Sequence, residues 1–221
     1  MGEHEYTILD CGHSVEETAE SLYTLVKERY SKEHVRQIIK ALKLAQSAHQ
    51  DQLRCNGDPY IIHPMRVALM LLKFDKDTIS KVFIGALLHD IVEKTNIGLV
   101  EIEEQFGGYV AELVQSVTRE HNERQSSQEK TEAKCQNWLK VISASHGVRM
   151  IKVCEDLENM ICWKTIPESD PGWKKIPRWM GEAEKMSLVL ARMTNLAAYS
   201  VMRQEYEYYV KCGFGDNTIT I

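Results

Sequence analysis

Apolar residues recur at intervals of three and four positions along most of this 221-residue chain, and this period limits the fold more than any other feature. One example is the run Val35, Ile38, Ile39 and Leu42, which Ser31 precedes as an N-terminal cap. This spacing is typical of one buried helix face, whereas a half-buried strand alternates at every second position. Because no useful strand alternation and no internal repeat occurs, the sequence predicts an all-α protein.

The composition is that of an ordinary globular chain with enough apolar residues for a core. Hydrophobic residues make up 43% and charged residues 27% of the chain, as in an ordinary soluble protein. The length of 221 residues suits one globular domain, or one domain with a helical extension. The net charge of −5 argues against a general affinity for nucleic acid polymers. No apolar run approaches the length of a membrane span and no signal-like leader opens the chain, so we expect a cytoplasmic protein without a membrane partner.

The six cysteines are spaced in a way that favours free thiols. No CxxC pair occurs, and Cys154 and Cys162 lie eight residues apart on one expected helix. A disulfide framework or a cysteine zinc cluster is therefore not expected.

Residues 86–93 (ALLHDIVE) end an apolar helical segment with a histidine and two carboxylates. Glu93 follows His89 by four residues and Asp90 by three, so it shares their helix face. Buried polar groups of this kind need a partner that offsets their loss of hydration. The segment predicts either a divalent metal site or a salt-bridged helix end at the surface.

Two further histidines stand near the ends of expected helices. His63 precedes Pro64, which fits the first position of a helix, so we expect His63 at the cap as a capping residue or a metal ligand. His49 closes an earlier apolar stripe, and a core or helix-end role is favoured over metal binding. Other helices are expected over 128–145, ended by His146 and Gly147, and over 178–211, broken near Thr194 and Asn195.

Residues 148–164 form the second unusual segment. Ile151, Glu155, Glu158 and Asn159 fall on one side of the expected helix. An acidic and amide stripe that continues an apolar one is what a helix facing a metal pocket would carry. A solvated helix face would carry the same acids, so both interpretations stand.

Four segments, taken in order, resemble those of the HD-domain metal-dependent phosphohydrolases. The resemblance is closest to the hydrolase domain of RelA/SpoT proteins and to the small alarmone hydrolases. The segments are residues 54–64 (RCNGDPYIIHP), 86–95 (ALLHDIVEKT), 106–107 with 114–118 (FG and VQSVT) and 150–160 (MIKVCEDLENM). The resemblance covers roughly residues 35–165. It implies an HD-domain helical bundle with a core at 31–165, an N-terminal helical extension at 1–30 and C-terminal helices packed on the core at 166–221.

The resemblance also implies a metal site. His63, His89 and Asp90 would bind one Mn²⁺ together with Glu155, and Fe²⁺ or Zn²⁺ would suit the same ligands. The family has an aspartate at the position of Glu155, so Asp156 is the alternative fourth ligand. The four-residue spacing from Glu155 to Asn159 matches the family and favours Glu155.

The implied reaction is attack of metal-bound water on the 3′ diphosphate of a (p)ppGpp-type alarmone, with release of pyrophosphate. Arg54, Asn56 and Asn159 would bind the nucleotide, and Glu93 would handle the proton of the water. Where the family has a second acid, this chain has Lys94. A charged lysine cannot accept a proton, but it can pair with a substrate phosphate.

Two other functions remain open. The first is a related nucleotide phosphohydrolase with a different substrate, and the second is a degenerate nucleotide-binding module without turnover. Lys94 and Glu155 favour the second. The fourth segment also departs from the family at Asp156 and Glu158, where the family has arginine and histidine. The expected partner is a small nucleotide, and the C-terminal helices either cover the core or pair in a homo-oligomer.

Overall fold

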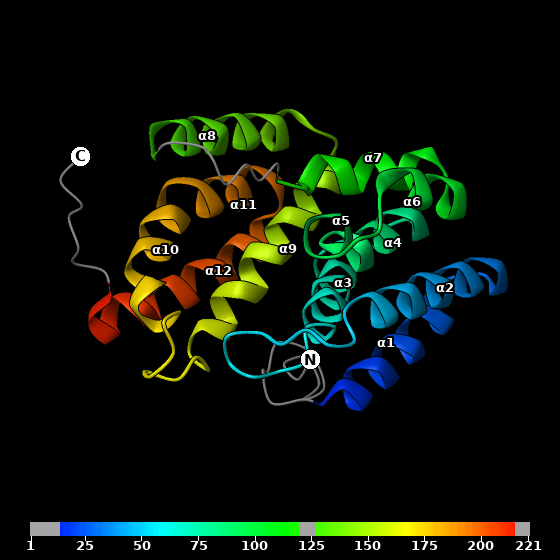
Figure 1. The fold of residues 1–221 in the computed structure, drawn as a ribbon, viewed down its shortest axis with the longest axis horizontal. Helices are drawn as coiled ribbons and strands as arrows, with labels where there is room; N and C mark the ends of the chain where they lie inside the picture. The colour runs from blue at the N-terminus through cyan, green and yellow to red at the C-terminus, as the bar shows by residue number, and fades with distance from the viewer. Residues whose placement is uncertain (1–13, 120–126, 215–221) are drawn as a thin grey trace.

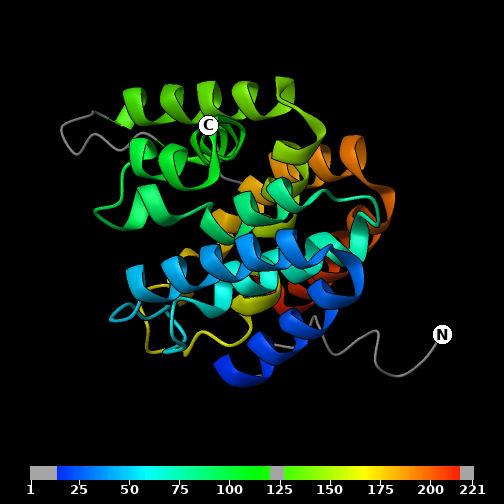
Figure 2. The ribbon, with the colours of Figure 1, turned by 90° about the vertical axis from the view of Figure 1, so that its right-hand side faces the viewer.

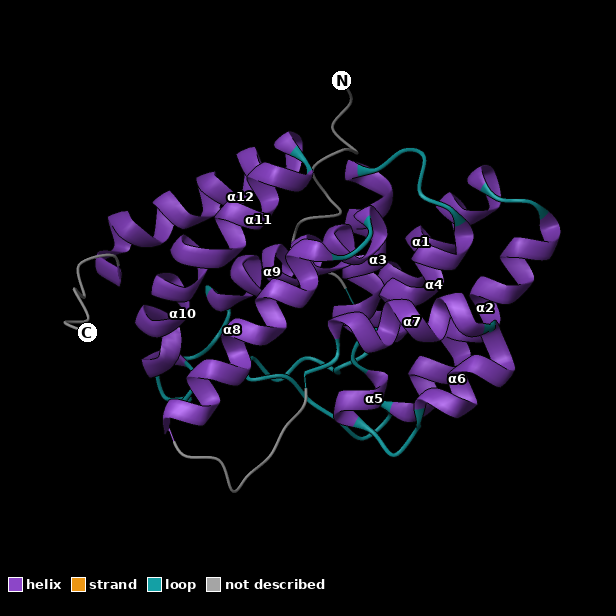
Figure 3. Cartoon of the chain, turned by 90° about the horizontal axis from the view of Figure 1, so that it is seen from above, coloured by secondary structure: helices purple, strands orange, loops and turns teal. Residues whose placement is uncertain are grey.

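A computed structural model describes residues 14–119 and 127–214, and their regular structure is helical apart from an isolated bridge between Leu53 and Pro59 (Figure 3). The all-α prediction is confirmed. The α-helices are α1 (Val15–Arg29), α2 (Lys32–Ala48), α3 (Ile62–Phe74), α4 (Ser80–Leu88), α5 (Ile91–Lys94), α6 (Leu99–Phe106), α7 (Gly108–Val117), α8 (Ser127–Ser143), α9 (His146–Trp163), α10 (Ile176–Glu182), α11 (Leu188–Thr194) and α12 (Leu196–Tyr209). A 3₁₀ turn covers Trp173–Lys175, and π-helical turns cover Ala183–Ser187 and Val210–Phe214.

Helix α9 occupies the middle of the molecule (Figure 1). It packs against α3, α4 and α7 on one side and against α11 and α12 on the other. Helices α1 and α2 cover α3 and α4 from outside, as the view from that side shows (Figure 2). One cluster of buried apolar side chains continues through all these helices, so α9 belongs to both sides of a shared core.

Two predicted helix boundaries are confirmed by their caps. The Ser31 hydroxyl accepts the His34 N–H at 3.3 Å and opens α2. Asn195 separates α11 from α12, and its side chain accepts the Ala198 N–H at 3.0 Å. The same amide donates to the Phe74 carbonyl at 2.9 Å, so it also ties the start of α12 to the end of α3.

The predicted start of α3 was wrong. The helix begins at Ile62 with Ile61 as its cap, so His63 lies in the first turn and Pro64 is the third residue. The first four N–H groups of a helix have no partner within it, and a proline among them therefore removes no hydrogen bond.

The predicted end of the helix over 128–145 was also wrong. His146 and Gly147 are the first residues of α9, which Ser145 caps. Glycine is placed there by packing, because a Cβ at Gly147 would lie 2.9 Å from Val82 Cγ2 on α4.

The cysteines that the structure describes are all free thiols, as expected: Cys55, Cys135, Cys154, Cys162 and Cys212. Cys11 lies outside the described residues. In the described ranges, no helix has the length and apolar character needed to cross a membrane.

Candidate functional site

Three donor atoms meet where α3 approaches the junction of α4 and α5. His63 lies in the first turn of α3, while His89 and Asp90 stand between α4 and α5. The Nε2 atoms of the two histidines are 3.2 Å apart, and the Asp90 Oδ2 atom lies 3.6 Å from His63 Nε2 and 3.4 Å from His89 Nε2. All three side chains are buried.

The hydrogen bonds of the two imidazoles decide which nitrogen carries the proton. The Nδ1–H group of His89 donates to the Ala86 carbonyl at 2.8 Å, and that of His63 donates to Glu158 Oε2 at 2.5 Å. Because a carbonyl and a carboxylate only accept, each neutral ring leaves a lone pair on Nε2. Two lone pairs and a carboxylate oxygen then face one another.

This donor set fits a divalent cation. Metal bonds of about 2.0–2.2 Å at ordinary ligand angles put neighbouring ligand atoms about 3–3.5 Å apart. The separations of 3.2 and 3.4 Å fall within that range, and the third, 3.6 Å, lies just above it. A ligand histidine whose other nitrogen donates to a carboxylate or carbonyl is also the usual support of a metal site.

Asp90 is held as a carboxylate. The Tyr60 hydroxyl donates to its Oδ2 atom through a short hydrogen bond. Burial raises the pKa of Asp90, whereas positive charge on His89 or His63 and the hydrogen bond from the Tyr60 hydroxyl lower it well below its ordinary value. The group is therefore charged and ready to bind a cation near neutral pH.

Glu155, the expected fourth ligand, lies outside the group of donor atoms that the structure brings within 4.8 Å of one another. Its Oε1 atom accepts from the buried Lys152 ammonium at 2.8 Å. Lys152 also binds Asp156 Oδ1 at 2.9 Å, and the Ser187 hydroxyl donates to Asp156 Oδ2 at 2.8 Å. Both oxygens of Asp156 are thus engaged away from the two histidines.

Glu93 and Lys94 form an ion pair with each other. The Lys94 Nζ atom lies 2.8 Å from Glu93 Oε1, and the Arg119 backbone N–H donates to Glu93 Oε2 at 3.2 Å. Against the effect of burial, this pairing lowers the pKa of Glu93 and raises the pKa of Lys94. Near neutral pH Glu93 is an acceptor and Lys94 is a cation.

The predicted nucleotide-binding residues lie on the loop before α3 and on α9. Arg54 donates from Nη1 to Glu158 Oε1 at 2.5 Å and from Nη2 to Asn159 Oδ1 at 2.9 Å. Asn56 instead holds its own loop, because its amide donates to Asp58 Oδ2 and to Thr165 Oγ1, both at 2.8 Å. Arg54 and Asn159 are therefore adjacent, while Asn56 is engaged elsewhere.

A cavity of about 1370 Å³ opens beside these groups. Its wall includes His63 from the metal group, the predicted nucleotide-binding residues and side chains from α8, α9 and α10. Trp179 on α10 stacks on Trp163 at the end of α9, with ring centroids 5.6 Å apart. The volume exceeds the roughly 300–1,000 Å³ of most small-molecule pockets.

Several groups that shape the site were not predicted from the sequence. Tyr60 was only part of a motif, yet its ring stacks on His49 at 4.9 Å and its hydroxyl binds Asp90. His49 caps the end of α2 and binds Gln52 Oε1 through Nδ1 at 2.8 Å, in keeping with the helix-end role. Glu158 lies on the acidic and amide stripe that the sequence places on one side of this helix, but the sequence predicts no role for it.

Comparison with known protein families gives one match that covers more than half of the chain. A family model described as the HD domain matches residues 41–174. Over 147 residues the chain is 35% identical to the guanosine-3′,5′-bis(diphosphate) 3′-pyrophosphohydrolase of Borreliella burgdorferi, a match that covers 65% of this chain and 22% of that protein.

Two other relatives are similar to the same extent. The bifunctional (p)ppGpp synthase/hydrolase SpoT of Escherichia coli is 34% identical over 146 residues, or 64% of this chain and 20% of that protein. The guanosine-3′,5′-bis(diphosphate) 3′-pyrophosphohydrolase of Aquifex aeolicus is 35% identical over 150 residues, or 66% of this chain and 20% of that protein. The chain thus spans about a fifth of the length of these relatives.

Among solved structures, a metazoan ortholog of SpoT that hydrolyzes ppGpp has a similar fold. The TM-score is 0.67 at 24% identity, and the match covers 78% of this chain and 95% of that one. At this identity the likeness bears on the fold alone.

Proposed function

This chain belongs to the HD-domain family, and we propose that it is a metal-dependent phosphohydrolase that removes the 3′ pyrophosphate from (p)ppGpp-type alarmones. The observation that carries the proposal is the buried triangle of His63 Nε2, His89 Nε2 and Asp90 Oδ2, with sides of 3.2–3.6 Å. The cavity beside it is large enough for a nucleotide with two diphosphate groups.

HD-domain hydrolases bind a divalent metal, and His63, His89 and Asp90 would hold it here. We propose Mn²⁺, and Fe²⁺ or Zn²⁺ suits the same mixed nitrogen and oxygen ligands. Glu155 is the proposed fourth ligand, because both oxygens of Asp156 are already bound by Lys152 and Ser187. A divalent ion at this position would lower the pKa of a water molecule and neutralise charge on a phosphoryl group.

The residues around the ion would divide the remaining work. Glu93, kept deprotonated by its neighbours, would accept the proton of the water. Lys94 adds positive charge beside Glu93, and the Arg119 guanidinium adds another positive charge 4.0 Å from Glu155, where both could attract the phosphates of the substrate. Arg54 and Asn159 would hold the nucleoside, and a contact from Asn56 requires that its bonds to Asp58 and Thr165 be exchanged.

A second candidate function is a nucleotide-binding module without turnover. The ion pair between Glu93 and Lys94 favours it, because the lysine lowers the basicity of the carboxylate that would take the proton. A third candidate, a phosphohydrolase of another nucleotide, uses the same metal group with different contacts along the cavity.

One assay separates these functions. The metal-loaded protein is incubated with ppGpp and with its adenine counterpart, and pyrophosphate and orthophosphate are measured separately. We expect pyrophosphate from ppGpp, and we expect His89→Ala and Asp90→Ala to lose both the bound metal and the product. Orthophosphate would indicate a different phosphohydrolase, and tight ppGpp binding without product would indicate the binding module.

We further propose that the protein works in the cytoplasm on a small nucleotide, without a nucleic acid polymer or a membrane as partner. The net charge of −5 supports the first exclusion. A homo-oligomer through the C-terminal helices stays a prediction.

A further inference from the structure

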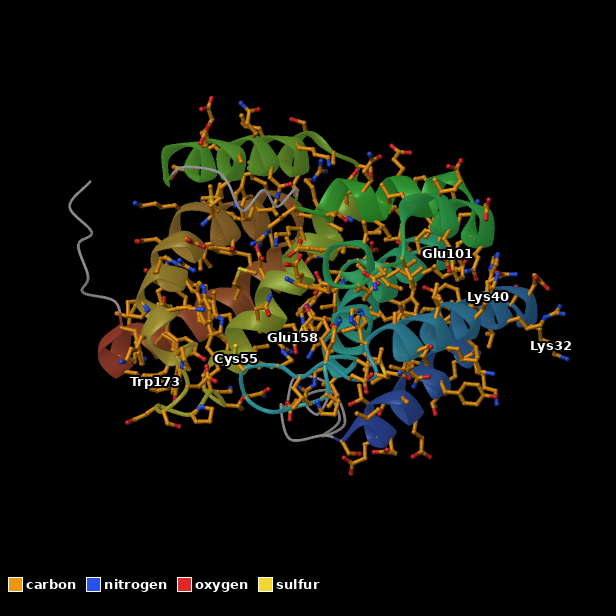
Figure 4. All side chains as sticks on the ribbon, viewed as in Figure 1. Lys32, Lys40, Cys55, Glu101, Glu158 and Trp173 are labelled. Atoms are coloured by element: carbon orange, nitrogen blue, oxygen red, sulfur yellow. The ribbon has the colours of Figure 1, made fainter. Side chains whose placement is uncertain are left out.

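Glu158 on α9 is the most deeply buried carboxylate near the site, with no exposed surface, and lies near the centre of the molecule (Figure 4). Each of its oxygens binds a different functional side chain. The Oε2 atom accepts from His63 Nδ1 at 2.5 Å, and the Oε1 atom accepts from Arg54 Nη1 at 2.5 Å. One side chain therefore touches both the metal group and the nucleotide-binding residues.

The charges around Glu158 make this arrangement specific for a carboxylate. Arg66 on α3 adds a second guanidinium 3.8 Å from Oε1, and the Cys162 thiol donates to the same oxygen at 3.2 Å. Every neighbour named here donates, so a side chain that only accepts satisfies all of them. A glutamine would turn its NH₂ group toward either His63 or Arg54, and one contact would then pair donor with donor.

We propose that Glu158 is a positioning residue that holds His63 toward the metal and Arg54 toward the cavity at the same time. Through Oε2 it keeps the proton of His63 on Nδ1 and leaves the Nε2 lone pair for the ion. Through Oε1 it fixes the Arg54 guanidinium beside Asn159, 2.9 Å from its Oδ1 atom. The role of Glu158 toward Arg54 rests on the proposed function, whereas its role toward His63 needs only the metal group.

The test compares five proteins: the wild type, Glu158→Gln, Glu158→Asp, Arg54→Ala and a control, Cys154→Ala. Glu158→Asp keeps the charge but shortens the side chain by one methylene, so it cannot reach both partners. Arg54→Ala removes only the Arg54 contact, and the buried carboxylate keeps both His63 and Arg66 as partners. Cys154→Ala is the matched control, because it truncates another buried side chain of α9 and leaves the bonds from Glu158 to His63 and Arg54 in place.

Two affinities of the metal-free proteins are measured. The first is the affinity for Mn²⁺, by calorimetry, and the second is the affinity for ppGpp in the absence of metal. Both Glu158 variants should bind Mn²⁺ about 10–100-fold more weakly, as is usual when the partner of a ligand histidine is lost. Arg54→Ala should weaken ppGpp binding alone, the Glu158 variants should weaken the binding of both ligands, and Cys154→Ala should change neither affinity. A purely structural role would lower the melting temperature and leave both affinities of the folded protein unchanged.

A nitrogen NMR spectrum of the metal-free protein gives a readout that needs neither ligand. In the wild type His63 should appear as the Nδ1–H tautomer with a strongly downfield Nδ1 proton, and in Glu158→Gln that signal should be lost. Wild-type Mn²⁺ affinity or an unchanged His63 tautomer in the Glu158 variants would overturn the inference. If those variants bind Mn²⁺ more weakly but the wild type releases no pyrophosphate, the proposed function is rejected. The role of Glu158 in positioning His63 is then still supported.

Discussion

His63 and His89 each use one ring nitrogen to bind the protein and present the other to a shared point. Their Nδ1 atoms bind Glu158 and the Ala86 carbonyl, so the Nε2 lone pairs stand 3.2 Å apart. Lone pairs at that distance repel, and a proton or a metal ion between them removes the repulsion. Asp90, the third donor, is likewise oriented by a hydrogen bond from a neighbouring side chain.

The first prediction concerns Tyr60, whose hydroxyl donates to Asp90 Oδ2. Tyr60→Phe should weaken Mn²⁺ binding about tenfold, because a ligand carboxylate loses the partner that orients it. Titration of the metal-free protein with Mn²⁺ measures this change. The control is Tyr23→Phe on α1, where the ring is 43% exposed and remote from the metal group. Equal Mn²⁺ affinity for the two variants would show that the hydroxyl has no such role.

The second prediction concerns Lys94. Lys94→Asp replaces the cation beside Glu93 with an anion, so a substrate phosphate is repelled rather than attracted. We expect KM for ppGpp to rise about tenfold, which corresponds to about 1.4 kcal/mol of lost binding. Steady-state kinetics with separate kcat and KM decides the outcome. A rise in kcat from an inactive starting protein would instead support the binding module, with turnover restored by a second acid.

At the scale of elements, close helix packing depends on particular glycines. A Cβ at Gly147 in the first turn of α9 would lie 2.9 and 3.2 Å from the two Cγ atoms of Val82 on α4. Gly181 in α10 has no heavy atom within 4 Å of the corresponding point. The two glycines are therefore a matched pair: Gly147 has no room for a side chain, and Gly181 has room for one.

The third prediction uses this pair. Gly147→Ala should lower the free energy of unfolding by about 1–3 kcal/mol through overpacking. Gly181→Ala should raise it by about 0.5–1 kcal/mol, since alanine loses less backbone entropy than glycine in a helix. Urea unfolding of both variants measures the difference. Stabilisation by both substitutions would mean that α4 and α9 move apart easily.

The fourth prediction concerns the link between α1 and the start of α4. The Tyr30 hydroxyl donates to the Thr78 carbonyl at 2.8 Å, and burial raises the pKa of Tyr30 from 10.0 to about 12. Tyr30→Phe should cost about 1 kcal/mol of stability at neutral pH, the usual net value of one hydrogen bond.

The pH dependence of the same variant follows from that raised pKa. Between pH 10 and 12 the unfolded chain releases the Tyr30 proton before the folded protein does, so the stability of the wild type falls as pH rises through this window. Tyr30→Phe lacks this contribution, and its stability should fall less steeply. Parallel stability curves for the two proteins above pH 10 would contradict the prediction.

The scale of elements also shows what the sequence could predict. Helical periodicity and caps such as Ser31 and Asn195 placed most helices, because both signals are local. Boundaries near Pro64 and Gly147 were misplaced for different reasons. A proline fits any of the first positions of a helix, and the space beside Gly147 depends on Val82 in a distant helix.

Long-range contacts explain what could not be predicted at the site. The resemblance of the motifs to those of HD-domain hydrolases was enough to propose His63, His89 and Asp90, and the structure brings these three together. The pairing of Glu158 with His63 and Arg54 spans 95 and 104 residues, and no local pattern reports such a distance. The division into 1–30, 31–165 and 166–221 stays a prediction, since one core cluster runs through all the packed helices.

At the scale of the whole molecule, the metal group connects parts of the fold that are distant in sequence. α3 and the α4–α5 junction supply its donors, and α9 supplies Glu158 from the centre of the molecule. An ion that binds all of these donors can bind only the folded chain. Metal binding and folding are therefore linked.

The fifth prediction follows from that linkage. At a free Mn²⁺ concentration of 100 times its Kd, the folded protein should gain about 2.7 kcal/mol, and its melting temperature should rise by several degrees. Removal of the metal with a chelator should reverse the shift, and His89→Ala should show none. Differential scanning calorimetry with and without Mn²⁺ tests this. An equal shift in His89→Ala would mean that the ion binds at another position.

The cavity wall formed by α10 lies beyond residue 174, where the match to the HD-domain family ends. Trp179, Glu182 and Ala183 thus belong to a part of the chain that the shared family pattern does not describe. We expect side chains on this wall to influence which ligand the cavity accepts. An attempt to redesign the selectivity of this protein would begin on that wall and leave the reaction centre intact.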